Sequence, residues 1–150
     1  MSDVQDVSFF DRVGGQPFFD RLVDVFYDGI AVDPVLLPLY PEQHDLGPAR
    51  RRLALFLGQY WGGPTTYSDE RGHPRLRMRH MTFTVGPLER DRWLHHMVHA
   101  VETATDSFTD PAEAAAVQQV LLAYFVPAAE HLRNDTGLPI SSVRPAPPAG

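Results

Sequence analysis

One periodicity governs most of this 150-residue sequence: apolar residues recur every three or four positions, and Pro or Gly ends each such run. Within 17–30, for example, Phe19, Val23, Phe26 and Ile30 fall on one helical face. We find no run that alternates apolar and polar residues between turn signals, as a half-buried strand would. The sequence therefore predicts an all-α fold, and its length suits one compact domain.

Six helices are expected, with approximate bounds at 8–13, 17–30, 48–60, 74–85, 87–104 and 111–134. The last has the clearest start, because Asp110 can cap it, Pro111 suits its first position and Glu113 its third, as in a capping box. Pro127 lies inside this helix and should bend it.

The segments outside these helices are expected to be irregular. A loop is expected from Thr65 to Gly72. From Leu138 the chain has four prolines and little to bury, which predicts a disordered tail. The expected organisation is one domain over 1–137 and a tail over 138–150.

Composition limits the chemistry that the chain can perform. Cysteine is absent, which excludes disulfides, thiolate zinc sites and thioether-linked cofactors. The formal net charge of −6 argues against a nucleic-acid partner, although nine of the thirteen Arg lie within 50–92 and could receive an anion. No apolar run looks long enough to cross a bilayer and the start is acidic, so we expect a cytoplasmic protein without a membrane partner.

A histidine lies on the apolar stripe of the helix expected at 74–85. Leu76, His80 and Phe83 fall within about 60° of one another on a helical wheel. Arg77 flanks this stripe. A buried neutral imidazole needs a partner, and a backbone carbonyl would suffice. A flat apolar ligand with a metal centre and carboxylates at its edge, such as haem, would instead use the histidine, the arginines and the aromatic residues of the facing helices together. The residues alone leave both interpretations open.

Two long motifs are FLGQYWGGPTTYSDERGHPRLRMRH over 56–80 and LERDRW over 88–93, and three short ones are RVGG at 12–15, FY at 26–27 and YPE at 40–42. Together they resemble the truncated haemoglobins, and within them the second group, of the actinobacterial type. The resemblance covers about 10–104 well and the last helix loosely. It implies an abbreviated globin, a two-over-two helical sandwich, with non-covalent haem b.

The resemblance also implies roles for individual residues. It places His80 as the proximal ligand of the iron, and Tyr27, Tyr40 and Trp93 around the bound gas as candidate catalytic residues. Ala49 takes the place where many globins have a histidine and cannot donate a hydrogen bond, so the phenols and the indole must do so. The candidate cofactor contacts are His80, Ala49, Leu53, Phe56, Leu76, Arg77, Phe83, Trp93 and Met97.

Two functions remain open under this resemblance. The first is a haem enzyme that turns over oxygen, by oxidising nitric oxide to nitrate or by using peroxide, with an unidentified reductase. The second is a protein that transports, stores or scavenges oxygen, carbon monoxide or another small ligand such as sulfide. Tight binding with slow release disfavours delivery, so redox chemistry is preferred. A homodimer is a further expectation.

Other polar residues have simpler interpretations. His95 and His99 are four apart and could bind zinc, but with Glu102 they lie opposite Trp93 on the wheel, which predicts a solvated face. His44 could reach the iron as a sixth ligand or lie in a surface loop, and we expect the loop. The triple arginine at 50–52 is expected to be solvated, with its last member a weaker candidate than Arg77 for a cofactor carboxylate.

Overall fold

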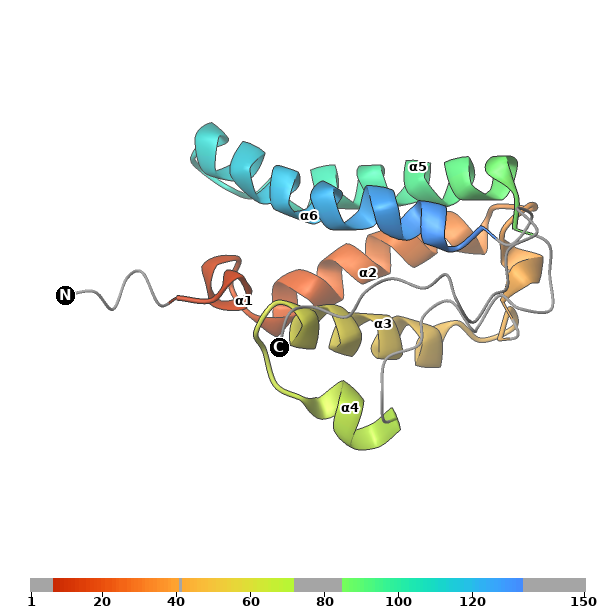
Figure 1. Cartoon of the computed structure of the whole chain (residues 1–150), viewed down its shortest axis with the longest axis horizontal. Coiled ribbons are helices and arrows are strands. Elements are labelled where there is room, and N and C mark those ends of the chain that lie inside the picture. The colour runs from red at the N-terminus through yellow and green to blue at the C-terminus, as the bar shows by residue number, and fades with distance from the viewer. Residues whose placement is uncertain (1–6, 41, 72–84, 134–150) are drawn as a thin grey trace.

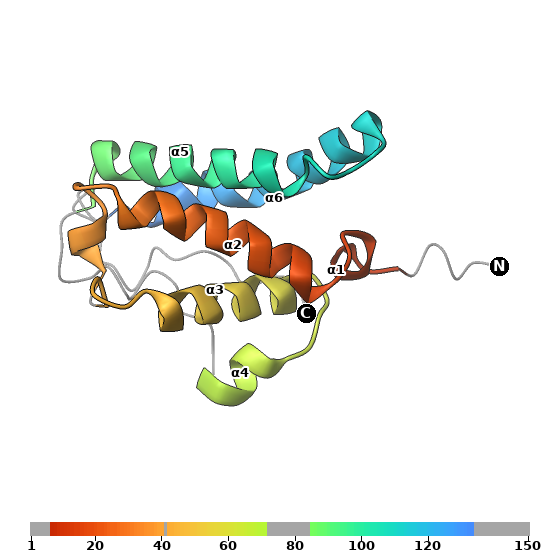
Figure 2. The same cartoon turned by 180° about the vertical axis from the view of Figure 1, so that it is seen from behind.

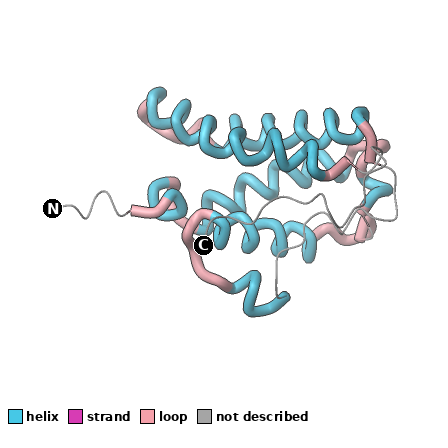
Figure 3. Tube along the Cα trace, viewed as in Figure 1, coloured by secondary structure: helices cyan, strands magenta, loops and turns pink. Residues whose placement is uncertain are grey.

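The computed structural model describes residues 7–40, 42–71 and 85–133. Every regular element in these ranges is helical (Figure 3). They are α1 (Phe9–Arg12), α2 (Gln16–Ala31), the short 3-10 helix η2 (Leu37–Leu39), α3 (Gly47–Tyr60), α4 (Thr66–Arg71), α5 (Pro87–Ala104) and α6 (Pro111–His131). The predicted all-α class is confirmed.

The four long helices form two layers. α5 and α6 pack together as one pair, and α2 packs against both α3 and α5, so α2 joins the two pairs (Figure 1). The view from behind shows the same arrangement, with α4 beyond α3 (Figure 2). This is the two-over-two sandwich that the resemblance implied.

Glycines allow the tight corner before α2 and the turn after α3. Gly14 and Gly15 have φ values of 105° and 82°, and Gly62 has a φ of 104°, a region that residues with a Cβ rarely adopt. α2 then buries an apolar face whose Phe19, Phe26 and Ile30 are fully excluded from solvent. The helical ends predicted from these glycines are confirmed.

The prediction of a loop from Thr65 to Gly72 was wrong, because α4 occupies 66–71. Contacts from outside the segment hold this short helix. The Gln59 Oε1 atom accepts a hydrogen bond from the backbone N–H of Ser68 at 3.0 Å, and the Gln59 amide donates to the Ser68 hydroxyl at 2.6 Å. Tyr67 is buried and packs edge-on against Phe56, with ring centroids 5.4 Å apart.

The ends of α5 and α6 agree with the sequence. Glu89 accepts a hydrogen bond from the N–H of Gly86 at 2.8 Å, and Asp110 accepts one from Ala112 at 2.9 Å. Glu113, expected to complete a capping box, forms an ion pair with Arg12 at 3.0 Å. α6 ends a few residues before the expected Asn134.

α6 departs from one expectation: by length and hydropathy alone it is apolar enough to cross a membrane. In this fold it serves as a core helix, because Val117, Leu121 and Phe125 are buried in the common core. The expected helix at 74–85, which carries Leu76, Arg77, His80 and Phe83, lies outside the described residues except for its last position. The tail from Leu138 lies wholly outside them.

Candidate functional site

Three buried aromatic residues with polar atoms meet where α2, η2 and α5 converge. Tyr27 lies on α2, Tyr40 follows η2 directly, and Trp93 lies in the second turn of α5; each is 6% exposed. The rings of Tyr27 and Tyr40 meet edge to face with centroids 5.7 Å apart. Phe26 packs edge-on against Trp93 at 5.3 Å. The structure thus brings together the three donors predicted for the distal side, and we call them the aromatic trio.

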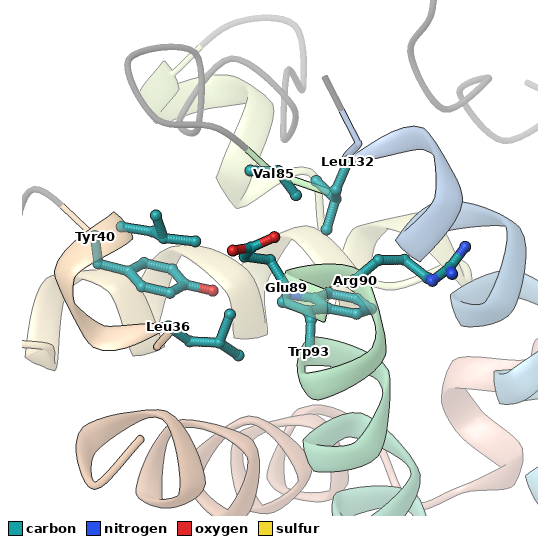
Figure 4. A pocket seen from close by; sticks show the side chains of 8 residues that line it. Leu36, Tyr40, Val85, Glu89, Arg90, Trp93 and Leu132 are labelled. Carbon is teal, nitrogen blue, oxygen red and sulfur yellow. The ribbon is translucent and has the colours of Figure 1, made fainter. Parts of the chain in front are cut away.

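The polar groups of the aromatic trio act on the Tyr40 hydroxyl. The Trp93 indole, which can only donate, favours the ionised form of Tyr40, whereas Tyr27 favours the protonated form. Figure 4 shows the Tyr40 hydroxyl pointing toward Trp93.

Burial raises the pKa of Tyr40 well above its usual value, and Tyr27 raises it further, whereas the Trp93 bond opposes the shift. Tyr40 therefore keeps its proton at every physiological pH.

Those apolar residues predicted to contact the cofactor that lie within the described ranges share the core with the trio. Ala49, Leu53 and Phe56 on α3 are 5%, 6% and 8% exposed, and Met97 on α5 is fully buried. Ala49 offers no donor, as expected. Phe56 faces α4 through its contact with Tyr67. The walls of the site are therefore apolar, and the described polar candidates are the members of the trio.

A small hollow opens beside Tyr40 and Trp93 (Figure 4). Its other lining residues are Leu36, Leu39, Val85, Glu89, Arg90 and Leu132. Both charged residues are engaged: Glu89 accepts from the Gly86 N–H at 2.8 Å, and Arg90 pairs with Asp91 at 2.6 Å and also with Glu130. The volume within which the centre of a water-sized molecule can move is about 10 Å³. The hollow therefore suits one small uncharged molecule and is too small for a macrocycle.

The triple arginine is not simply solvated. Arg50 pairs with Asp24 at 3.2 Å and Asp28 at 3.0 Å. Arg51 pairs with Glu70 at 2.6 Å, and Arg52 pairs with Glu42. These arginines therefore bind α3 to its neighbours. The expected solvation is confirmed for Arg51, which is 59% exposed, and was wrong for Arg50 and Arg52, which are 26% and 14% exposed.

The described residues fit a haem group in two respects. Apolar side chains of α3 and α5 form the walls, and donors stand at one side of them. In addition, the Nε atom of Arg52 is buried and has no hydrogen-bond partner within the described ranges, although the rest of the guanidinium is paired with Glu42. An N–H in that state can serve a carboxylate at the edge of a ligand.

The other histidines have the places expected from the sequence. His44, His95 and His99 are exposed. Within 7–40, 42–71 and 85–133, no three His, Asp or Glu side chains are grouped so as to hold a metal ion. The proposed iron ligand His80 and the candidates Leu76, Arg77 and Phe83 lie outside these ranges, so their roles stay predictions.

Sequence reasoning missed one buried charge beside the trio. Asp33, between α2 and η2, is 3% exposed, yet it accepts hydrogen bonds from Arg92 and binds His96 at 2.7 Å. The pair Asp33-Pro34 is a turn signal that can be read from the sequence. Its partners lie 59 and 63 positions away, and no local pattern reveals them.

Residues 8–124 match the family of bacterial-like globins. This chain belongs to that family. A group 2 truncated haemoglobin of Bacillus subtilis is 41% identical over 88 residues, which cover 59% of this chain and 65%, just under two thirds, of that protein. One of Lotus japonicus is 35% identical over 132 residues, covering 87% of this chain and 78% of the other.

Solved structures give the same answer. The thermostable haemoglobin of the actinobacterium Thermobifida fusca superposes with a TM-score of 0.76 at 52% identity, covering 87% of this chain and 99% of that one. The chain is accordingly a group II truncated haemoglobin. Membership of the globin family supports a general function for this chain, the haem-based binding of oxygen or another small ligand.

Proposed function

We propose that this globin binds haem b through His80, holds oxygen beside the aromatic trio and turns the oxygen over in redox chemistry. The reaction would be the oxidation of nitric oxide to nitrate or the use of peroxide. The observation that carries the proposal is that three buried aromatic donors, Tyr27, Tyr40 and Trp93, stand together beside an α3 face whose Ala49, Leu53 and Phe56 are apolar.

When bound, haem supplies the iron that takes the gas and exchanges electrons. The chain supplies the surroundings. Trp93 is held by α5, and Tyr40 packs edge to face against Tyr27. The indole N–H and both phenol hydroxyls can donate to a ligand. All three atoms are shielded from water, so each bond to a ligand is formed in a medium that strengthens it.

The size of this effect favours retention of the ligand. A hydrogen bond to a group with anionic character contributes roughly 1.5–3 kcal/mol. Since about 1.4 kcal/mol is tenfold in an equilibrium constant, one such donor slows release of the ligand by roughly ten- to hundredfold. A protein that releases oxygen slowly is a poor carrier. One structural neighbour, from Bacillus subtilis at 31% identity, is described as an oxygen-avid truncated haemoglobin, which supports the same view.

The alternative is a non-catalytic carrier, store or scavenger of oxygen, carbon monoxide or sulfide. Stopped-flow mixing of the oxygenated reduced protein with nitric oxide, followed by repeated reduction, separates the two. Sustained formation of nitrate with a cellular electron donor is the expected result. A single fast turnover that stops until excess chemical reductant is added would contradict an enzymatic role and favour scavenging.

The setting of the protein belongs to the same proposal. We propose that it works in the cytoplasm with a separate reductase that supplies the electrons for repeated turnover. A homodimer is proposed as well, and its test is the mass in solution by light scattering of the haem-loaded protein.

A further inference from the structure

Asp33 is a charge placed where water cannot reach it. Its side chain is 1% exposed. The Oδ1 atom accepts from the backbone N–H groups of Val35 at 2.8 Å and Leu36 at 3.1 Å, and from Arg92 Nε at 3.0 Å. The Oδ2 atom lies 3.1 Å from Arg92 Nε and 2.7 Å from His96 Nε2. An ionised carboxylate only accepts, so His96 carries its proton on Nε2.

These bonds outweigh the cost of burying the carboxylate. Burial by itself would raise the pKa of Asp33, but the hydrogen bonds from Arg92, His96, Val35 and Leu36 hold it well below its usual range. Asp33 is therefore ionised whenever the protein is folded near neutral pH.

The carboxylate joins the two segments that carry Tyr40 and Trp93. On one side, the Asp33 carbonyl accepts a hydrogen bond from the Leu37 N–H at 3.0 Å, and the Leu37 carbonyl accepts one from the Tyr40 N–H at 3.1 Å. Two successive backbone hydrogen bonds therefore fix the position of Tyr40 relative to Asp33. On the other side, Arg92 is the residue before Trp93, on the same turn of α5.

His96 adds a third fixed point, on α2. A Cβ atom placed on Gly29 would lie 2.4 Å from His96 Nδ1 and 3.0 Å from its Cε1. Such a contact is closer than side chains allow, so the imidazole rests directly on the α2 backbone. His96 is also one turn after Trp93. The α2, η2 and α5 segments are thus locked together around one carboxylate.

We propose that Asp33, with Arg92 and His96, forms a positioning cluster that sets the position of Trp93 relative to Tyr40 and through it the rate of ligand release. In this role the cluster acts through the aromatic trio, as a set of positioning residues. This inference rests on the proposed ligand-binding function, but the position of the Trp93 indole can be measured without oxygen.

The first test is Asp33→Asn in the haem-loaded protein. The amide has the same shape and keeps one acceptor oxygen, but it is neutral and cannot accept from all donors. In the diamagnetic carbon monoxide complex, the indole N–H of Trp93 should exchange with solvent faster by threefold or more, and its nitrogen-bound proton resonance should move. Oxygen release should accelerate by about three- to tenfold, less than for loss of the whole donor.

Gly29→Ala tests the same cluster without changing a charge, and it remains informative if the Asn variant does not fold. The methyl group must displace His96, so both readouts should move in the same direction by a smaller factor. Asp106→Asn is the matched control, since Asp106 pairs with Arg21 at 3.3 Å and its side chain is 61% exposed. It should leave both readouts unchanged.

The outcomes separate the two proposals. One outcome is that Asp33→Asn and Gly29→Ala lower the melting temperature but leave the Trp93 indole proton and the oxygen release rate as in the wild type. The cluster would then only stabilise the fold, and the inference would be overturned. If the indole proton moves while the wild-type protein proves unable to retain oxygen, the cluster positions Trp93 as proposed and the ligand-binding proposal is the one that fails.

Discussion

Two clusters of arginine and carboxylate flank the aromatic trio, and they differ in burial. The Asp33 side chain is 1% exposed, whereas those of Asp24 and Asp28 are 61% and 71% exposed. Asp33 ties α5 to the segment of Tyr40. Asp24 and Asp28 tie α2 to α3 through Arg50, whose guanidinium also lies over the Tyr27 ring, 5.9 Å from its centroid.

The comparison shows that arginine–carboxylate ion pairs on two sides of the same site contribute very differently to the free energy of unfolding. Around Arg50, water solvates whichever carboxylate loses its partner, so each exposed pair contributes roughly 0–1 kcal/mol. Around Asp33, two backbone N–H groups and the His96 side chain, which is 18% exposed, depend on one shielded carboxylate that water does not easily replace, although Arg92 is 39% exposed and can be solvated. The buried cluster should therefore be nearly all-or-none, and the exposed cluster should be tolerant.

The largest expected effect is that of Asp33→Ala. Removing the carboxylate leaves Arg92, His96 and the N–H groups of Val35 and Leu36 without their acceptor, and the loss of one partner from a buried ion pair costs about 3–5 kcal/mol of unfolding free energy. Urea unfolding of the haem-loaded protein, followed by circular dichroism, measures it. Asp28→Ala is the control, with a loss below about 1 kcal/mol. Similar losses for the two variants would contradict the comparison.

The next effect concerns the trio that both clusters flank. Trp93→Phe keeps an aromatic ring in the core and deletes the only N–H of the side chain. Release of oxygen should become roughly ten- to hundredfold faster, corresponding to roughly 1.5–3 kcal/mol, with little change in association. Stopped-flow replacement of oxygen by carbon monoxide gives the rate. An unchanged release rate would show that Trp93 does not donate a hydrogen bond to bound oxygen.

A smaller effect is the pH dependence of stability. The folded pKa of Asp33 is lowered, so its contribution is complete above the ordinary carboxyl pKa of about 4 and is lost as the pH falls further below that value. The unfolding free energy of the wild type should therefore approach that of Asp33→Asn as the pH falls from 4 to 2.5. For Asp24→Asn the difference from the wild type should stay small throughout. A constant difference between wild type and Asp33→Asn would show that charge at Asp33 is irrelevant.

The sequence predicted most of the fold because local signals determine it. Helices α2, α3, α5 and α6 follow from apolar spacing, with prolines in their first turns and glycines at their corners. The segment of α4, in contrast, has a polar sequence without a clear apolar face. It becomes helical through Gln59 and Tyr67, which are tertiary contacts and have no local signature.

Only part of the candidate site was predictable from the sequence, as was the case for the fold. The resemblance to truncated haemoglobins named Tyr27, Tyr40 and Trp93, and the structure brings them together. The support behind them was not predicted. An Asp at the end of a helix is most often solvated. Asp33 differs only because the fold places Arg92 and His96 of a distant helix over it.

The smallest effect tests the exposed half of the comparison. Arg50→Ala should lower the unfolding free energy by about 0.5–1 kcal/mol at low ionic strength, since its pairs with Asp24 and Asp28 are screened by solvent. In 1 M salt, where the Debye length is about 3 Å, most of this loss should vanish, whereas the loss in Asp33→Ala should persist because salt does not enter the buried cluster. Urea unfolding at both ionic strengths measures the two losses. A salt-insensitive loss at Arg50 would mean that packing over the Tyr27 ring, and not charge, joins α3 to α2 at this point.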